Sequence, residues 1–345
     1  EKSTRFRRMR GAYTPCMCVD VCMSLAKSDV EQYGVGSNMR AKLIRAGRVW
    51  CQCMRCAGPG DNTVPVKFFK EQARMMSMSD RREQFQYAFL DSGIGGLPYA
   101  HALRVRVPEA SLVYVADRVY FPYGNKSSAQ IIARASAVLQ KVQTNFSPHI
   151  VVLACNSMSV NALEFLRAQV SVPVVGVVPA IKQAVACSHK KHIGVLATQC
   201  TITHPYTACL RAQFGAGCVF QMRADARLIE CLERGLIFEV EDMQREAVAR
   251  SVMPFQEAGV DVLVLACTHF VHVRHLFQDC VGTSCTVVDS LEGVVRRTLR
   301  LCPPQSQLRG NAACYVTGAR DAVCAARYAR YAQHFGLRWA GFLDV

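Results

Sequence analysis

From residue 86 onward, short apolar runs of strand length alternate with longer segments whose apolar residues recur at helical spacing. The runs are nearly continuous in Val, Ile and Leu, which is typical of parallel strands with both faces covered by helices. The predicted strands are Tyr87–Leu90, Leu112–Val115, His149–Ala154, Pro173–Val178, Ile193–Ala197, Val260–Ala266 and Thr286–Val288, and the clearest predicted helices are Ala129–Phe146 and Ser159–Gln169. The pattern therefore predicts an α/β fold with mainly parallel sheets.

Small polar and ionisable side chains gather where these predicted strands end. In open α/β sheets, ligands bind at the carboxyl ends of the strands. The residues in question are Asp91, Ser92, Cys155, Asn156, Ser157, Thr198, Cys267, Thr268, His269, Asp289 and Ser290. We expect a functional site among them.

The two halves of this region resemble each other. Val151–Ala154 leads into Cys155–Asn156–Ser157, and Val262–Ala266 leads into Cys267–Thr268–His269. Two further matches are Phe89–Ser92 with Gly194–Thr198 and Val174–Val178 with Thr286–Asp289. We therefore predict two similar domains related by a pseudo-two-fold axis, with the active site in the cleft between them. The predicted bounds are 81–182 plus 293–345 for the first domain and 183–292 for the second.

The paired cysteines suggest a specific chemistry. A proton that leaves one face of a carbon atom and returns on the other requires one acid/base on each side and no cofactor. A free thiol has a pKa near 8.5, and the N–H groups at a helix N-terminus favour its thiolate. Asp91 can relay a proton beside one thiol and His269 beside the other.

Core packing and zinc binding are the alternatives to catalysis for these two cysteines. A single cysteine that ends an apolar strand is more often a packing residue than a base. Two that occupy equivalent positions in a repeat, each followed by polar residues, favour catalysis. Neither Cys155 nor Cys267 has a second ligand in a Cys-x2-Cys arrangement, so a zinc site is not predicted.

The segment Asp91–Gly96 is glycine-rich and follows a predicted strand. It lacks the Gly-x-Gly-x-x-Gly spacing of a dinucleotide site, and no Lys-Ser/Thr pair follows it. We expect its backbone N–H groups to bind a substrate carboxylate, with the glycines permitting close approach.

The first 80 residues differ from the rest of the chain. They lack strand–helix alternation, contain six cysteines (Cys16, Cys18, Cys22, Cys51, Cys53 and Cys56) and are basic within a chain of net charge +15. We predict that residues 1–80 form an extension that is poorly ordered or is not part of the working protein. A zinc site at these cysteines and a nucleic-acid role for the basic residues are weaker alternatives.

The composition bounds the setting of the protein. About half of the residues are hydrophobic, and no apolar run reaches the length of about 18 residues that a membrane helix needs. The cysteines do not form the short, regular framework of a secreted disulfide protein. We therefore expect a cytoplasmic protein with no membrane partner.

Five motifs, in this order along the chain, make it resemble the glutamate racemase family within the aspartate/glutamate racemases. They are Phe89–Gly96, Tyr120–Ser127, Cys155–Ser157, Gly194–Thr198 with Thr201, and Cys267–His269. The similarity extends from about residue 86 to about residue 295.

The resemblance implies conversion of L-glutamate to D-glutamate for peptidoglycan precursors, and so a role in cell-wall biogenesis and cell shape, without a cofactor or a metal. It implies a homodimer with glutamate as the small-molecule partner. By carry-over, the catalytic residues are Cys155, Cys267, Asp91, His269 and Glu233, and the substrate-binding residues are Asp91, Ser92, Pro122, Tyr123, Gly124, Asn156, Ser157, Thr198, Thr201, Thr268 and His269.

The chain departs from the family pattern at several positions. Ser157–Met158 stands where Thr-Ala is usual, Ala266 replaces a common glycine, and Phe270–Val271 replaces Tyr-Pro. Ala224–Asp225 stands in place of the Cys-Pro that precedes the helper carboxylate matched here by Glu233. None of these changes removes a proton-transfer group. The alternatives are a racemase of aspartate or another acidic amino acid, and a degenerate racemase that binds DNA or a DNA enzyme.

Overall fold

The computed structural model describes residues 84–305 and 310–345. Residues 82–345 form a compact unit by themselves. The predicted extension, with its six cysteines, lies outside the described residues.

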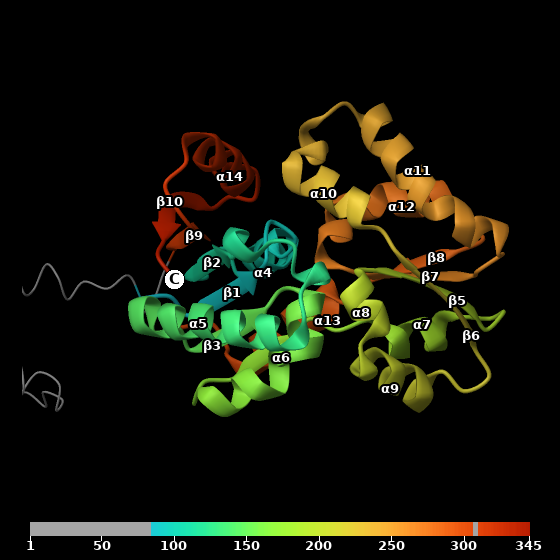
Figure 1. Cartoon of the computed structure of the whole chain (residues 1–345), viewed down its shortest axis with the longest axis horizontal. Helices are drawn as coiled ribbons and strands as arrows, with labels where there is room; N and C mark the ends of the chain where they lie inside the picture. The colour runs from blue at the N-terminus through green and yellow to red at the C-terminus, as the bar shows by residue number, and fades with distance from the viewer. Residues whose placement is uncertain (1–83, 306–309) are drawn as a thin grey trace, which may run out of the picture. The chain divides into compact units, whose positions relative to one another are not determined.

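The described chain folds into two parallel sheets with helices on both faces, as Figure 1 shows. The first sheet has the order β10-β9-β2-β1-β3-β4. Its strands are β1 (Tyr87–Asp91), β2 (Leu112–Ala116), β3 (Ile150–Leu153), β4 (Val174–Gly176), β9 (Ala312–Thr317) and β10 (Arg338–Leu343). The second sheet has the order β6-β5-β7-β8, with β5 (His192–Ala197), β6 (Val219–Ala224), β7 (Val262–Ala266) and β8 (Thr286–Val288). The predicted α/β class with mainly parallel sheets is confirmed.

The two sheets share one topology. The order β2-β1-β3-β4 in the first sheet matches β6-β5-β7-β8 in the second, and β9 and β10 extend the first sheet beyond β2. The strands matched by the sequence repeat are therefore equivalent: β1 with β5, β3 with β7, and β4 with β8. The domain bounds at residues 182 and 293 remain a prediction, and the strands of each sheet fall within the range predicted for its domain.

Helices connect the strands. In the order of the chain they are α4 (Leu97–Arg106), α5 (Ser128–Phe146), α6 (Asn156–Gln169), α7 (Ile181–Cys187), α8 (Gln199–Thr203), α9 (Pro205–Phe214), α10 (Ala226–Arg234), α11 (Glu241–Glu257), α12 (Arg274–Val281), α13 (Leu291–Leu301) and α14 (Ala322–His334). The short 3₁₀ helices are η2 (Arg118–Tyr120), η3 (Tyr123–Asn125), η4 (Leu236–Phe238) and η5 (Thr268–Val273). Within the described residues, no helix combines the length and apolar character needed to cross a membrane.

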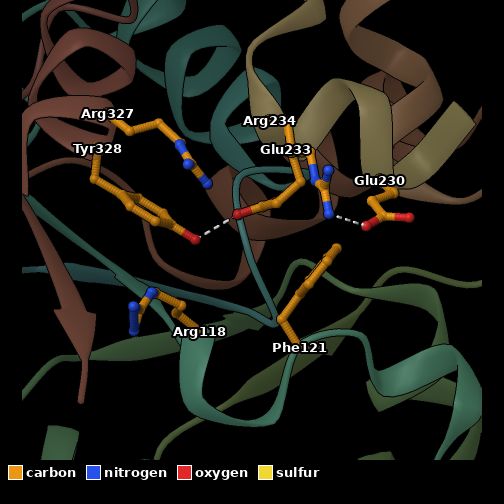
Figure 2. Close-up of a pocket in the computed structure, with 7 residues that line it drawn as sticks. All are labelled: Arg118, Phe121, Glu230, Glu233, Arg234, Arg327 and Tyr328. Atoms are coloured by element: carbon orange, nitrogen blue, oxygen red, sulfur yellow. Dashed lines mark hydrogen bonds and ion pairs between the residues drawn. The ribbon is translucent and has the colours of Figure 1, made fainter. Parts of the chain in front are cut away.

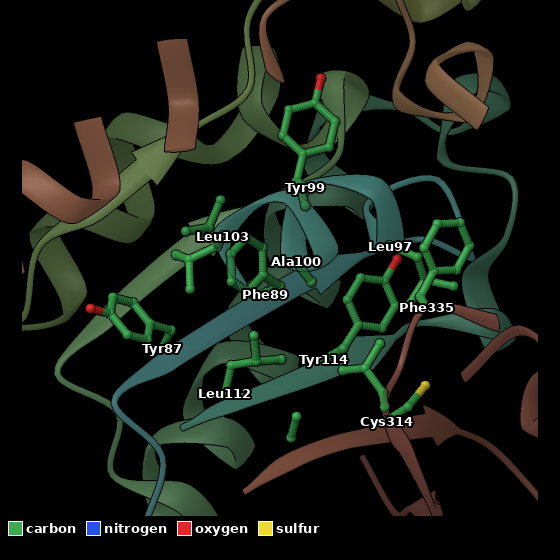
Figure 3. Packing of buried hydrophobic residues seen from close by; sticks show 14 of the residues in the cluster. Tyr87, Phe89, Leu97, Tyr99, Ala100, Leu103, Leu112, Tyr114, Cys314 and Phe335 are labelled. Atoms are coloured by element: carbon green, nitrogen blue, oxygen red, sulfur yellow. The ribbon is translucent and has the colours of Figure 1, made fainter. Parts of the chain in front are cut away.

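Each strand of the first sheet contributes side chains to a core on both of its faces. In β1, Tyr87 and Phe89 pack with residues of α4, α13 and α14, whereas Ala88 and Leu90 pack with residues of α5 and α6. Figure 3 shows the first of these cores, in which Phe89 lies among side chains from neighbouring strands and α4. Burial on both faces explains why the strands read as continuous apolar runs.

The strands that the apolar pattern missed lie mainly at the sheet edges. β6 is the edge of the second sheet, and none of its residues is fully buried. β10 is the edge of the first sheet, and only Leu343 in it is buried. β9 is internal, but its sequence Ala-Ala-Cys-Tyr-Val-Thr has few of the β-branched residues that mark a strand.

Candidate active site

The two cysteines occupy equivalent places in the two sheets. Cys155 follows β3 and lies at the N-cap of α6, and Cys267 follows β7 and lies at the N-cap of η5. Both are buried, with exposed fractions of 6% and 5%. Because β3 and β7 are equivalent strands, each half of the molecule supplies one thiol, and the two thiols occupy equivalent positions in the fold.

Cys155 is held as a thiol by its surroundings. Burial raises its pKa well above the ordinary value, and the nearby charge of Asp91 raises it further. The backbone N–H of Met158 lowers the pKa, but by less than these two effects raise it. The helix N-terminus favours the thiolate as expected, through the N–H of Met158, but for Cys155 desolvation outweighs this effect.

Asp91 connects the two halves beside Cys155. Its Oδ1 accepts hydrogen bonds from Ser92 Oγ (3.2 Å) and Gly93 N (3.0 Å), and its Oδ2 accepts one from Thr268 Oγ1 of the second sheet (3.2 Å). Ser92 Oγ lies 3.8 Å from Cys155 Sγ, so this hydroxyl stands between the carboxylate and the thiol. Burial raises the pKa of Asp91 to about 6. At neutral pH this carboxylate is ionised, yet it binds a proton readily.

Cys267, His269 and Glu233 form a chain of contacts. Cys267 Sγ lies 3.9 Å from His269 Nδ1, and His269 Nε2 donates to Glu233 Oε2 at 2.9 Å. Burial by itself lowers the pKa of His269, but the hydrogen bonds to Cys267 and Glu233 raise it well above the ordinary value. The imidazolium therefore persists beside the thiol, as in nucleophilic sites where a carboxylate orients a histidine. The helper carboxylate predicted at Glu233 lies on the far side of the His269 ring from the sulfur.

Three N–H groups of the glycine-rich turn donate to protein side chains, and the third of them is Gly96 N, which donates to Tyr114 Oη. Gly93 N donates to Asp91, and Ile94 N donates to Glu233 Oε2 at 2.9 Å. The expectation that N–H groups of the turn Asp91–Gly96 bind a substrate carboxylate remains a prediction. The glycines let the second half approach: a Cβ at Gly95 would lie 2.5 Å from both His269 Nδ1 and Thr268 Oγ1.

We expect Gly95→Ala to lower kcat/KM by about tenfold or more, because its methyl group displaces His269 from Cys267. The measurement is the steady-state rate of the reaction that the resemblance implies, with circular dichroism as the test of folding. Gly293→Ala is the matched control, since a Cβ at Gly293 in α13 meets no atom within 4 Å. Equal activity in both variants would contradict the close approach at Gly95.

Three hydroxyl groups meet between the halves. Ser157 Oγ lies 2.8 Å from Thr198 Oγ1 and 3.5 Å from Thr201 Oγ1, and Thr198 Oγ1 donates to Thr201 Oγ1 at 3.0 Å. Gly124 lies against the same threonine, because a Cβ there would come within 2.7 Å of Thr198 Cβ. The predicted substrate-binding residues Gly124, Ser157, Thr198 and Thr201 are thus brought together.

Tyr123 is a predicted substrate-binding residue, but its hydroxyl group is occupied by another residue of the protein. It is buried, and its O–H donates to Asp117 Oδ2 at 2.7 Å instead of pointing to an open site. Asp117 also binds Arg134 at 2.7 Å. Pro122, which precedes Tyr123, follows a cis peptide bond. If Tyr123 contacts a substrate, it does so through its backbone or its ring.

Asn156 carries a donor that the described part of the chain leaves without a partner. The residue is 3% exposed, and its Nδ2 is a buried side-chain nitrogen with no hydrogen bond. A buried unsatisfied donor is costly, and it is rare in native structures unless a ligand or water meets it. Asn156 directly follows Cys155 in the chain, at the start of α6.

Two contacts were missed by the sequence reasoning. Phe121 lies with its ring centre 5.7 Å from that of His269, and the Tyr328 O–H donates to Glu233 Oε1. Tyr328, Glu233 and Phe121 line a pocket (Figure 2), and the volume of this pocket is about 220 Å³. Phe121 lies inside the motif Tyr120–Ser127, so the sequence marked its neighbourhood. Tyr328 lies beyond the region of resemblance, so no motif pointed to it.

The arrangement favours proton transfer between protein groups. In residues 84–305 and 310–345, no group of three or more His, Cys, Asp and Glu side chains is placed to hold a metal ion. The predicted catalytic residues Cys155, Cys267, Asp91, His269 and Glu233 are all buried and linked across the two halves.

Comparisons with known proteins agree with this arrangement. The family model described as Asp/Glu/Hydantoin racemase matches residues 99–298. The chain is 36% identical over 236 residues to the glutamate racemase of Shewanella loihica, which covers 68% of this chain and 87% of that protein. It is also 36% identical over 222 residues to the glutamate racemase of Sphingopyxis alaskensis, covering 63% and 82% of the two chains.

A solved structure shares the fold. The crystal structure of Escherichia coli glutamate racemase, in complex with L-glutamate and the activator UDP-MurNAc-Ala, is similar with a TM-score of 0.69 and 31% identity. The similarity covers 76% of this chain and 99% of that one. The family model spans both cysteine motifs and more than half of the chain, and the chain therefore belongs to the Asp/Glu/hydantoin racemase family.

Proposed function

We propose that this protein interconverts L-glutamate and D-glutamate by moving the Cα proton between two thiols. The observation that carries the proposal is the equivalent placement of Cys155 and Cys267 after matched strands, with Asp91 and Thr268 hydrogen-bonded across the halves between them. The relatives and the solved structure named above are glutamate racemases, which supports glutamate as the substrate.

The proton steps follow from the site. A thiolate at one cysteine takes the Cα proton, which leaves a planar carbanion, and the thiol of the other cysteine donates a proton to the opposite face. Cys155 is the thiol in the closed site, and His269 as an imidazolium stabilises a thiolate at Cys267. When Cys155 acts as the base, Asp91 receives its proton through Ser92.

Contacts to the substrate follow from the remaining groups. The unpartnered Nδ2 of Asn156 is a donor for a substrate carboxylate. The hydroxyl groups of Ser157, Thr198 and Thr201 lie together between the halves and can bind the amino and carboxylate groups of an amino acid. Ser92 and Thr268 bind Asp91 in the closed site and lie next to the thiols.

The direct test is exchange in heavy water. With L-glutamate in D2O, we expect D-glutamate to form and the Cα proton to be replaced by deuterium, because the returning proton comes from a thiol that has equilibrated with solvent. Polarimetry follows the first change and proton NMR the second. Inversion without deuterium uptake, or neither change with any acidic amino acid, would overturn the proposal.

The same assay decides between substrates. L-Aspartate is one methylene shorter, and we expect it to exchange at least about tenfold more slowly because its side-chain carboxylate falls short of the donors set for glutamate. Faster exchange of aspartate would instead support the aspartate racemase alternative.

We place the reaction in the cytoplasm, as the source of D-glutamate for peptidoglycan precursors. The support is the activity itself, since D-glutamate is a cell-wall component, and the reducing setting that free thiols at the site require. The homodimer implied by the resemblance remains a prediction, which light scattering on the purified chain tests.

A further inference from the structure

Three elements hold the carboxylate of Glu233. Its Oε2 accepts hydrogen bonds from Ile94 N in the glycine-rich turn and from His269 Nε2 after β7, each at 2.9 Å. Its Oε1 accepts a hydrogen bond from the O–H of Tyr328 in α14. Glu233 itself belongs to α10, so the Tyr328 contact joins the last helix of the first half to the second half (Figure 2).

We propose that Tyr328 is a positioning residue of the racemisation: its phenol fixes the Glu233 carboxylate in the orientation that binds His269 and thereby sets the imidazolium beside Cys267. This inference rests on the proposed function. Tyr328 acts through Glu233 and touches neither thiol in any contact of the described residues.

The pocket beside Glu233 explains why the carboxylate needs to be held. Three arginines line this pocket together with Glu233 and Tyr328, and they are Arg118, Arg234 and Arg327. Arg118 forms an ion pair with Asp321, and Arg234 forms one with Glu230. The side chains of both ion pairs are partially exposed. A carboxylate that is free to turn in such a pocket is attracted by guanidinium groups. The Tyr328 hydrogen bond opposes that rotation by occupying Oε1.

Tyr328 is suited to this role because it is always a donor. The residue is 1% exposed, and burial raises the pKa of its phenol well above the ordinary value, with the charge of Glu233 acting in the same direction. The proton therefore stays on the phenol throughout the pH range in which the enzyme works.

The ionisable groups that face His269 come from every element around it. Cys267 faces Nδ1, Glu233 faces Nε2, and Asp91 and His272 interact with it electrostatically. Burial and the charge of His269 lower the pKa of His272 to about 3, so His272 is neutral. Of the two carboxylates, Glu233 alone hydrogen-bonds to the ring.

The test is Tyr328→Phe in the full chain. We expect kcat to fall about tenfold, the factor that corresponds to losing one hydrogen bond to a charged group, with KM for glutamate changed less than threefold. The pKa of His269 falls when its carboxylate partner is displaced, so the basic limb of the kcat/KM profile is expected to move about one pH unit lower.

Tyr331→Phe is the matched control. Tyr331 also lies in α14, is fully buried, and its O–H also donates to α10, but it donates to the backbone carbonyl of Leu232 and not to a side chain. We expect Tyr331→Phe to keep the wild-type pH profile and kcat within threefold. Equal changes in both variants would mean that Tyr328 only helps to hold the halves together, and would overturn the proposal.

A double-mutant cycle completes the test. If Tyr328 acts through Glu233, then Tyr328→Phe has less than a twofold effect in a Glu233→Gln background. Full additivity of the two substitutions, or a Tyr328→Phe variant with wild-type kcat and pH profile, overturns the inference while leaving the racemase activity intact. Absence of racemisation in the wild-type chain overturns the proposed function instead.

Discussion

Cys155→Ser and Cys267→Ser are each expected to lower the rate of racemisation in both directions by a factor of about 10³ or more. Inversion uses both thiols in every turnover, one as the base and the other as the acid. A serine hydroxyl is a far weaker acid and its alkoxide is inaccessible at neutral pH, so either substitution stops the same overall reaction. The measurement is steady-state racemisation from each enantiomer.

The two variants should differ in the half-reaction that they retain. The remaining cysteine faces one side of Cα, so it can still remove and return the proton of one enantiomer, and solvent deuterium then enters without inversion. We expect Cys155→Ser to exchange the enantiomer whose Cα–H faces Cys267, and Cys267→Ser to exchange the other. Proton NMR in D2O on each pure enantiomer shows which is labelled.

Cys302→Ser is the control for these substitutions. Cys302 is 7% exposed, close to the 6% of Cys155 and the 5% of Cys267, and its sulfur accepts a hydrogen bond from Gln86 that a serine oxygen can also accept. We expect it to keep wild-type activity. Two catalytic variants that label the same enantiomer would contradict the assignment of one thiol to each face.

The parallel strands of the fold could be predicted because burial on both faces leaves a continuous apolar run. All seven predicted strands are present, and the equivalence of β3 with β7 followed from comparing their ends. The cysteines were located by the same reasoning, since position after a buried strand is readable from sequence. β6 and β10 could not be found this way, because an edge strand buries few residues and shows no apolar run.

The electrostatics of the site depended on packing that sequence does not show. A helix N-terminus beside Cys155 could be predicted, but the desolvation that outweighs it is a property of the folded interior. The glycine-rich turn was recognised, but its partners are Glu233 and His269, which lie 139 or more residues away in the chain at the point where the halves meet. Tyr328 joins them from a helix whose sequence carries no motif.

Two buried aspartates lie at the ends of neighbouring strands, and their hydrogen-bond partners give one a chemical role and the other a structural role. Asp91 ends β1 and Asp117 follows β2, and Asp117 N donates to the Asp91 carbonyl at 2.7 Å. Both are fully buried. Asp117 is paired with Arg134 at 2.7 Å, whereas the hydrogen bonds to the Asp91 carboxylate come from hydroxyl and backbone groups. Asp91 can therefore take up and release a proton, whereas Asp117 anchors the fold.

Asp91→Asn is expected to lower kcat/KM about 100-fold near neutral pH, the scale of a lost general base. The pKa of Asp91 is about 6, so wild-type activity should fall as pH decreases through 6, where the carboxylate takes a proton and can no longer accept one from Cys155. The amide does not titrate, and the variant should lose this acidic limb. An unchanged limb in the variant would show that another group produces it.

Asp117→Asn provides the contrast. It removes one partner of a buried ion pair, and we expect it to lower the free energy of unfolding by about 3 kcal/mol without changing the position of the acidic limb. Guanidinium unfolding at fixed pH measures the first quantity and the pH–rate profile the second. A shifted limb in Asp117→Asn would mean that the ion pair at Asp117 influences the pKa of Asp91.

Stability should change in the opposite direction in Asp91→Asn. The folded state raises the pKa of Asp91 from 3.8 to about 6, so it holds the proton more tightly than the unfolded chain, and an ionised Asp91 costs about 3 kcal/mol above pH 6. The cost develops between pH 4 and pH 6 and vanishes below pH 4, where both states are protonated.

Asparagine keeps the bonds from Ser92 and Gly93 through its oxygen, and its amide can donate to Thr268 Oγ1 because a hydroxyl also accepts. We therefore expect Asp91→Asn, although less active, to be more stable than the wild type at pH 7 and equally stable near pH 4. A variant less stable at pH 7 would show that the buried charge of Asp91 is compensated in the fold, and that its raised pKa does not arise from desolvation.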